Sequence, residues 1–115
     1  MRTLKWIGRE GLLMCKYNPR IDLWAFIYLK DDVEKVDDKI TKLVERFAAS
    51  NERKVNMRGY MCKLTGAIHG HKKFDDGKII VTSLVEEIER VDKNYLVVKT
   101  QYGNYYIDGN ERIDP

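Results

Sequence analysis

The chain has 115 residues, of which 34% are charged and 43% hydrophobic, and its formal net charge is +3. This length and composition favour one folded domain over residues 1–115 and exclude a low-complexity or disordered protein. No stretch approaches the roughly 18 consecutive apolar residues of a membrane span, and the start MRTLKWIGRE lacks the apolar region of a signal peptide. The sequence therefore predicts a cytoplasmic protein without membrane contact.

The first half, residues 1–50, is predicted to hold strands and one helix. TLKWI and GLLMCKY flank GREG, which favours a hairpin loop, although GREGLLMCKY could equally begin as a helical turn. LWAFIYL, residues 23–29, is a short apolar run rich in aromatic residues, and its length predicts a buried strand.

One amphipathic helix is predicted over residues 32–49. Asp31 or Asp32 could cap it, and the position of Lys42 and Arg46 in its second half suits the helix dipole. Because its apolar residues form a single stripe, we expect a sheet to cover them. The stripe comprises Val33, Val36, Ile40, Leu43, Val44 and Phe47.

A basic connector leads into the second half, residues 57–110, which reads as five short strands separated by turns rich in Gly, Asn and Asp. The strands are YMCKLTGAI, KIIVT, LVEEIERV, YLVVKT and YYID. In the first of them, alternation places Tyr60, Cys62, Leu64 and Ile68 on one side. The alternation slips near Ser83 and Leu84, which predicts a bulge or bend. We expect an α+β fold: N-terminal strands, one helix, and a five-stranded curled antiparallel sheet or SH3-like small barrel.

Turn glycines and strand residues recur in a recognisable order in this half. They are Gly70-His71, Phe74, Asp76-Gly77, Ile80, Thr82-Ser83, Val97, Thr100, Gly103, Tyr106 and Gly109. This pattern resembles a small β unit of bacterial and phage proteins of unassigned function. The resemblance covers roughly residues 60–110, implies a fold, and brings no catalytic residue with it.

A metal site is the first candidate chemistry. His69 and His71 would face the same way on one strand, and Cys62 and Cys15 could complete four ligands. The spacing matches no known metal motif, and Cys62 is in phase with the apolar Leu64. A buried thiol is the simpler interpretation, and no disulfide framework is expected.

Catalysis is not predicted. Ser50 and Ser83 lack any surrounding nucleophile elbow or phosphate-binding loop. Asp75 and Asp76 are adjacent carboxylates in an Asp-Gly turn, where neighbouring side chains point apart. The sequence predicts no enzyme activity and no cofactor.

Nucleic-acid binding has more support, because cationic grooves with exposed aromatic residues are how small barrels hold single strands. Residues 51–80 carry seven Lys or Arg against three acidic residues. The predicted contacts are Arg53, Lys54, Arg58, Lys63, Lys72, Lys73, Phe74 and Lys78, accompanied by Tyr60, Tyr102, Tyr105 and Tyr106. The alternative is that these aromatic residues fill the core and the lysines only solvate loops.

Protein binding draws on the acidic residues instead, which could mimic phosphate towards a basic partner. The predicted patches are Asp31, Asp32, Asp37 and Asp38 on the helix and Glu86, Glu87 and Glu89 on a strand. The preferred interpretation is a non-catalytic regulatory protein of a bacterium, phage or mobile element. Its expected target is a host nucleoprotein such as a CRISPR-Cas or other defence complex, with single-stranded nucleic-acid or nucleotide binding as the alternative. An edge strand in YYIDGNERIDP would allow a homodimer.

Overall fold

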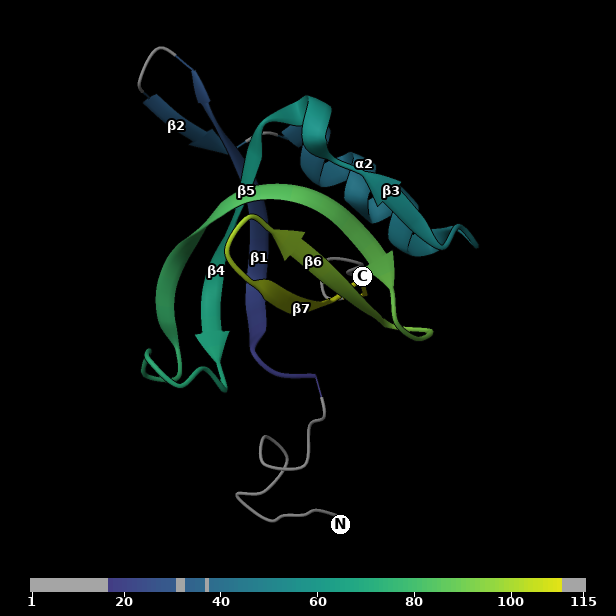
Figure 1. The fold of residues 1–115 in the computed structure, drawn as a ribbon. Coiled ribbons are helices and arrows are strands. Elements are labelled where there is room, and N and C mark those ends of the chain that lie inside the picture. Colours follow the sequence, from purple (N-terminus) through teal and green to yellow (C-terminus); the bar gives the residue numbers. More distant parts are fainter. Residues whose placement is uncertain (1–16, 31–32, 37, 111–115) are drawn as a thin grey trace.

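The computed structural model describes residues 17–30, 33–36 and 38–110 of the chain. Within them, seven strands form one sheet and a single α-helix packs beside it (Figure 1). The strands are β1 (Arg20–Lys30), β2 (Val33–Val36), β3 (Lys54–Asn56), β4 (Cys62–His69), β5 (Lys78–Arg90), β6 (Tyr95–Thr100) and β7 (Asn104–Asp108). The helices are α2 (Asp38–Ala49) and the short 3-10 helix η1 (Arg58–Tyr60). The protein is therefore mostly β with one helix, as expected of an α+β fold, and the predicted hairpin around GREG lies outside the described residues.

The sheet runs in the order β2-β1-β4-β5-β6-β7, and β3 pairs with β5. It curls so far that β7 returns to β1, where Arg20 pairs with Tyr106 and the Tyr106 amide donates to the Pro19 carbonyl at 2.9 Å. The result is barrel-like without being a closed barrel. β6 pairs along the whole of β7, the strand that was predicted to offer an edge for a homodimer.

The helix begins later than predicted. Val33–Val36 form β2, which pairs antiparallel with β1 and places Val36 opposite Ile27. A spacing of three between two valines fits either structure, but β-branched residues suit strands and the backbone of β1 needs hydrogen-bond partners along its edge. The first part of the predicted helix is therefore wrong, and Asp31 and Asp32 lie outside the described residues.

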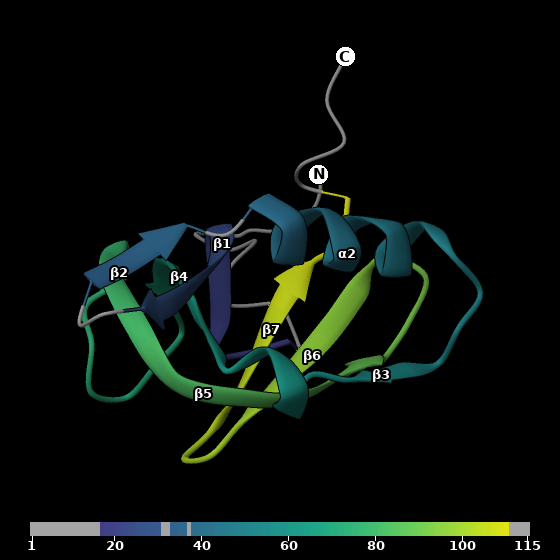
Figure 2. The same ribbon diagram turned by 90° about the horizontal axis from the view of Figure 1, so that it is seen from above.

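The rest of the predicted helix is confirmed, and so is the expectation that a sheet covers its apolar face. Ile40, Val44 and Phe47 are buried in the same core cluster as the inward residues of the sheet. Figure 2 shows α2 lying along one side of the curled sheet, close to the ends of β6 and β7. None of the helices in the described ranges is long and apolar enough to cross a membrane.

The predicted bend near Ser83 is confirmed, although KIIVT and LVEEIERV form one long strand rather than two. The register between β4 and β5 shifts after Lys63, so β5 carries an extra residue there. The Thr82 hydroxyl accepts a hydrogen bond from the Leu64 amide at 3.1 Å and donates one to the Ser83 carbonyl at 2.8 Å. A buried side chain thus satisfies the amide that the bulge deprives of a backbone partner.

Leu23 was expected inside a buried strand, but its side chain is 73% exposed. Its φ of 54° belongs to a second irregularity, between Asp22 and Ala25 of β1. Gly66 lies against this bulge, and a Cβ there would come within 2.5 Å of the Asp22 carbonyl oxygen. Only glycine permits so close an approach of β4 to β1.

Candidate nucleic-acid interface

A groove of about 440 Å³ lies between the β4–β5 loop and the β6–β7 turn, with the residues that precede β1 as a third wall. We call it the loop groove. It is lined by Asn18, Pro19, Gly70, His71, Lys72, Lys73, Tyr102, Gly103, Asn104 and Tyr105. No carboxylate occurs among these lining residues.

Short-range hydrogen bonds shape the loop side of the groove. Gly70 adopts a φ of 75° directly after β4, and its amide donates to Asp76 Oδ1 at 2.9 Å. A Cβ on Gly70 would lie 2.6 Å from Asn18 Oδ1, so the glycine also keeps two walls of the groove in contact. Asp76, one of the adjacent carboxylates considered for catalysis, thus holds the loop.

His71 organises the aromatic side of the groove. Its Nδ1 accepts a hydrogen bond from the Lys73 amide at 2.9 Å, which fixes the ring within the loop. The ring centroid lies 4.8 Å from that of Phe74, and the ring is nearly parallel to Tyr105, at 14° and 6.5 Å between centroids. Tyr102 stands at the turn with 88% of its surface exposed, and its amide donates to Ser83 Oγ at 3.1 Å.

Four of the eight predicted nucleic-acid contacts gather here. Lys72 and Lys73 line the groove, and neither forms an ion pair with any residue that the structure describes. Phe74 packs against the core beneath His71, and Lys78 Nζ lies 5.4 Å from the Phe74 ring centroid. This arrangement places two cations and exposed aromatic surface on one groove.

The other four predicted nucleic-acid contacts, all of them cations, lie elsewhere. Arg58 sits in η1 and pairs with Glu86 at 3.6 Å, and Lys54 of β3 lies opposite Glu89. Arg53 precedes Lys54, and Lys63 lies near the far end of β4 from the loop groove. The basic block of the sequence is therefore not one surface.

The strand acids are also engaged within the molecule. Lys99 Nζ lies 2.7 Å from Glu89 Oε1 and 3.3 Å from Glu87 Oε2. The hydrogen bond and positive charge of Lys99 hold the pKa of Glu89 below its usual 4.5, and the two glutamates raise the pKa of Lys99 above 10.5. We call Glu87, Glu89 and Lys99 the paired surface. Asp31, Asp32, Asp37 and the side chain of Asp38 lie outside what the structure describes, so the acidic interface stays a prediction.

Cys15, one of the four proposed metal ligands, lies outside the described residues, and the structure does not bring the other three together. His69 ends β4 and its Nε2 contacts Asp22 Oδ2 at 3.2 Å, whereas His71 turns into the loop groove. Cys62 is fully buried in the core at the other end of β4, about 23 Å from His69 along the strand. In the described ranges, no three His, Cys, Asp or Glu side chains are placed to share a metal ion. Cys62 is a core thiol, as the simpler interpretation predicted.

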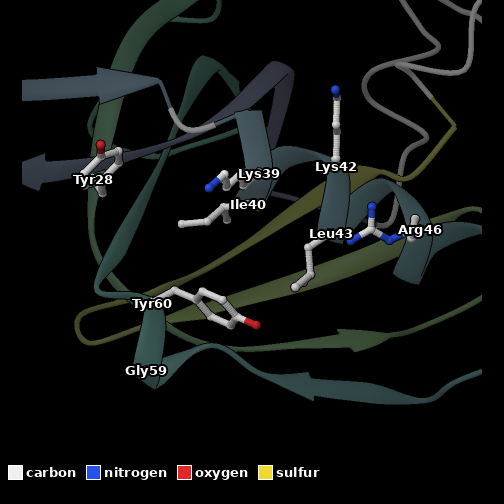
Figure 3. Close-up of a pocket in the computed structure, with 8 residues that line it drawn as sticks. All are labelled: Tyr28, Lys39, Ile40, Lys42, Leu43, Arg46, Gly59 and Tyr60. Atoms are coloured by element: carbon white, nitrogen blue, oxygen red, sulfur yellow. The ribbon is translucent and has the colours of Figure 1, made fainter.

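A second groove was missed in the sequence. Its cations Lys39, Lys42 and Arg46 lie on α2, with Lys42 pointing away from Tyr60, and Tyr60 of η1 lines the other side of the groove (Figure 3). Tyr60 was expected to share the inner face of β4 with Cys62, but it precedes the strand and is 43% exposed. The sequence did contain a sign of this groove, because Lys39, Lys42 and Arg46 are spaced at i, i+3 and i+7 and therefore share one helix face.

Comparison with known proteins adds no relative. No family model matches the chain, and neither the curated proteins nor the solved structures provide a match. The resemblance to a small β unit of bacterial and phage proteins therefore stays a prediction.

Proposed function

We propose that this protein is a non-catalytic cytoplasmic binding module of the SH3-like small-barrel kind, and that it holds single-stranded nucleic acid in the loop groove. One observation carries the proposal: two lysines without ion pairs among the described residues line the same groove as His71, Tyr105 and the exposed Tyr102. Lysines would neutralise phosphates, and exposed rings would stack on bases whatever their sequence.

A single strand fits this groove better than a duplex. Its bases are free to splay onto aromatic side chains, whereas the bases of a duplex are stacked on one another. The paired surface offers less to any ligand, because Glu87 and Glu89 already interact with Lys99. Acidic mimicry of phosphate towards a host nucleoprotein remains the other predicted function.

The test is the affinity of the full chain for a fluorescein-labelled oligo(dT) and for a duplex of equal length. We expect Lys72→Glu with Lys73→Glu to weaken single-strand binding roughly a hundredfold near 0.1 M salt. Each lost phosphate contact is worth about 1 kcal/mol there, and reversed charge adds repulsion. The slope of log affinity against log salt should become shallower by about 1.4.

The matched control is Arg53→Glu with Lys54→Glu, which changes the net charge equally outside the loop groove. It should leave affinity within about threefold of the original protein, since it removes no groove contact. Equal losses in both variants would show that overall charge governs binding. Absence of single-strand binding by the original protein at low salt would contradict the proposal outright.

A further inference from the structure

The groove on α2 differs from the loop groove in both shape and lining. It encloses about 540 Å³ between α2, η1 and the end of β1, and we call it the helix groove. Tyr28 contributes from β1, which places the helix groove at the opposite end of that strand from Pro19 and the loop groove. About 30 Å of strand separates these two residues, so the grooves are independent sites.

The floor of the helix groove is apolar. Ile40 is buried against the core, Leu43 is half-buried, and Tyr60 is 43% exposed. Leu43 and Tyr60 point towards one another across the groove in Figure 3. Gly59 lies beside Tyr60, and a Cβ there would meet nothing within 4 Å, so the backbone at this rim is open. Such a floor accepts an aliphatic or aromatic side chain.

The opposite rim is cationic. Lys39, Lys42 and Arg46 are all exposed and occupy one helix face, spanning about 10 Å along the axis. No carboxylate occurs among the groove's lining residues, and neither Lys42 nor Arg46 forms an ion pair with a residue that the structure describes. The groove therefore combines an apolar floor with two cations, Lys42 and Arg46, that have no ion-pair partner among the described residues.

We propose that the helix groove is a docking site for an acidic segment of a partner protein, one that alternates carboxylates with apolar side chains. In an extended segment, residues on one side are about 6.6 Å apart, close to the axial spacing of about 6 Å between Lys42 and Arg46. The apolar side chains would enter the floor while the carboxylates meet the rim. A nucleic acid fits less well, because Leu43 faces Tyr60 and the groove contains no near-parallel ring pair like that of His71 and Tyr105.

The probe is a short fluorescein-labelled peptide in which Glu alternates with Leu or Phe, titrated with the full chain and followed by anisotropy. We expect saturable binding, and replacing every Glu of the peptide by Gln should weaken it about tenfold. Lys42→Glu with Arg46→Glu should abolish binding, and Tyr60→Ala should weaken it several-fold. The milder pair Lys42→Gln and Arg46→Gln serves as a second variant if charge reversal destabilises the helix.

The matched control is Lys72→Glu with Lys73→Glu, which should leave the peptide affinity unchanged. This outcome separates the docking site from the nucleic-acid proposal, since either groove can fail alone. Equal binding of the Glu and Gln peptides, no binding of either, or indifference to the changes at Lys42 and Arg46 would overturn the docking site. It would also be overturned if those changes weakened oligo(dT) binding as much as the Lys72 and Lys73 changes do.

Discussion

The cations at the two ends of β5 differ in whether they have partners within the described part of the molecule. Near its C-terminal end, Arg90 and Lys99 of the neighbouring strand are bound within the molecule, whereas Lys72 and Lys73 in the loop before its N-terminal end have no ion pair in the described ranges. The difference follows from position. Lys99 lies directly opposite Glu87 in the register of β5 and β6, so the ladder itself supplies a partner. A loop beyond the strand ends has no such neighbour. At these two places, charge within the strand ladder stabilises the fold, while the charge of the β4–β5 loop has no ion-pair partner among the described residues.

Arg90 is the clearest case of a structural cation. Its Nη2 donates to the carbonyl oxygens of Phe47 and Ser50, both at 2.8 Å, and its Nε donates to the Glu52 carbonyl at 3.2 Å. These are carbonyls at and just beyond the C-terminus of α2, where helices leave acceptors unsatisfied and favour positive charge. Arg90, which belongs to the predicted strand LVEEIERV, therefore links the end of α2 to β5.

The largest effect should come from removing this attachment. We expect Arg90→Ala to lower the free energy of unfolding by about 3 kcal/mol, because it leaves several carbonyls without a charged donor. Urea denaturation measures the loss, and oligo(dT) affinity should be unchanged under conditions where the variant is folded. Arg90→Lys keeps the charge without the planar fork and should lose less. A loss below about 0.5 kcal/mol would mean that the carbonyls are satisfied by water and the contrast with Lys72 is weaker than inferred.

Tyr102→Ala should have an intermediate effect, confined to binding. We expect about a tenfold loss of single-strand affinity, within the range of about 1–3 kcal/mol for one stacked base. The melting temperature should not change, because the ring is 88% exposed and contributes little burial. Val91→Ala is a matched control, since Val91 is exposed at the distant β5–β6 turn. Unchanged affinity for Tyr102→Ala would remove stacking at this turn from the proposed site.

The smallest effect should be a pH-dependent one on the paired surface. Glu89 has a lowered pKa, so its contribution to stability is present above its usual 4.5 and is lost as pH falls through the lower folded value. Lys99 has a raised pKa, so its contribution is present below 10.5 and is lost as pH rises through the higher folded value. Lys99→Met should therefore lower the melting temperature slightly between about pH 5 and pH 10, and the difference should shrink in acid.

Lys93→Met is the control for that measurement. It removes one positive charge at the exposed β5–β6 turn, and Lys93 forms no ion pair with a described residue. If the two variants show the same pH profile, the stability change reflects net charge rather than the Glu89–Lys99 pair.

Local patterns were enough to predict several elements of the fold. Ile40, Val44 and Phe47 recur at helical spacing and all three are buried. The slip in alternation near Ser83 marked the bulge in β5, because one extra residue reverses which side chains face inward. The Asp75-Asp76-Gly77 turn followed from residue preference alone, and Gly77 has the expected positive φ of 91°.

The candidate site was only half visible in the sequence. Lys72, Lys73 and Phe74 are neighbours in the chain and were predicted together. Their alignment with Tyr105 depends on how the β6–β7 turn comes back over the β4–β5 loop, which no local pattern encodes.

By itself, the amino-acid sequence determined what neighbouring residues decide: the apolar face of the helix, the turns, the bulge and the overall balance of charge. Tertiary structure alone decided that Val33–Val36 pair with β1 instead of extending α2. It also decided that Lys99 forms an ion pair with Glu89, whereas Lys72 forms none with a residue that the structure describes. The physical reason is that hydrogen-bonded pairing and ion pairing depend on distances between residues far apart in the chain. Those distances are set by the curl of the whole sheet, and the curl places His71 beside Tyr105.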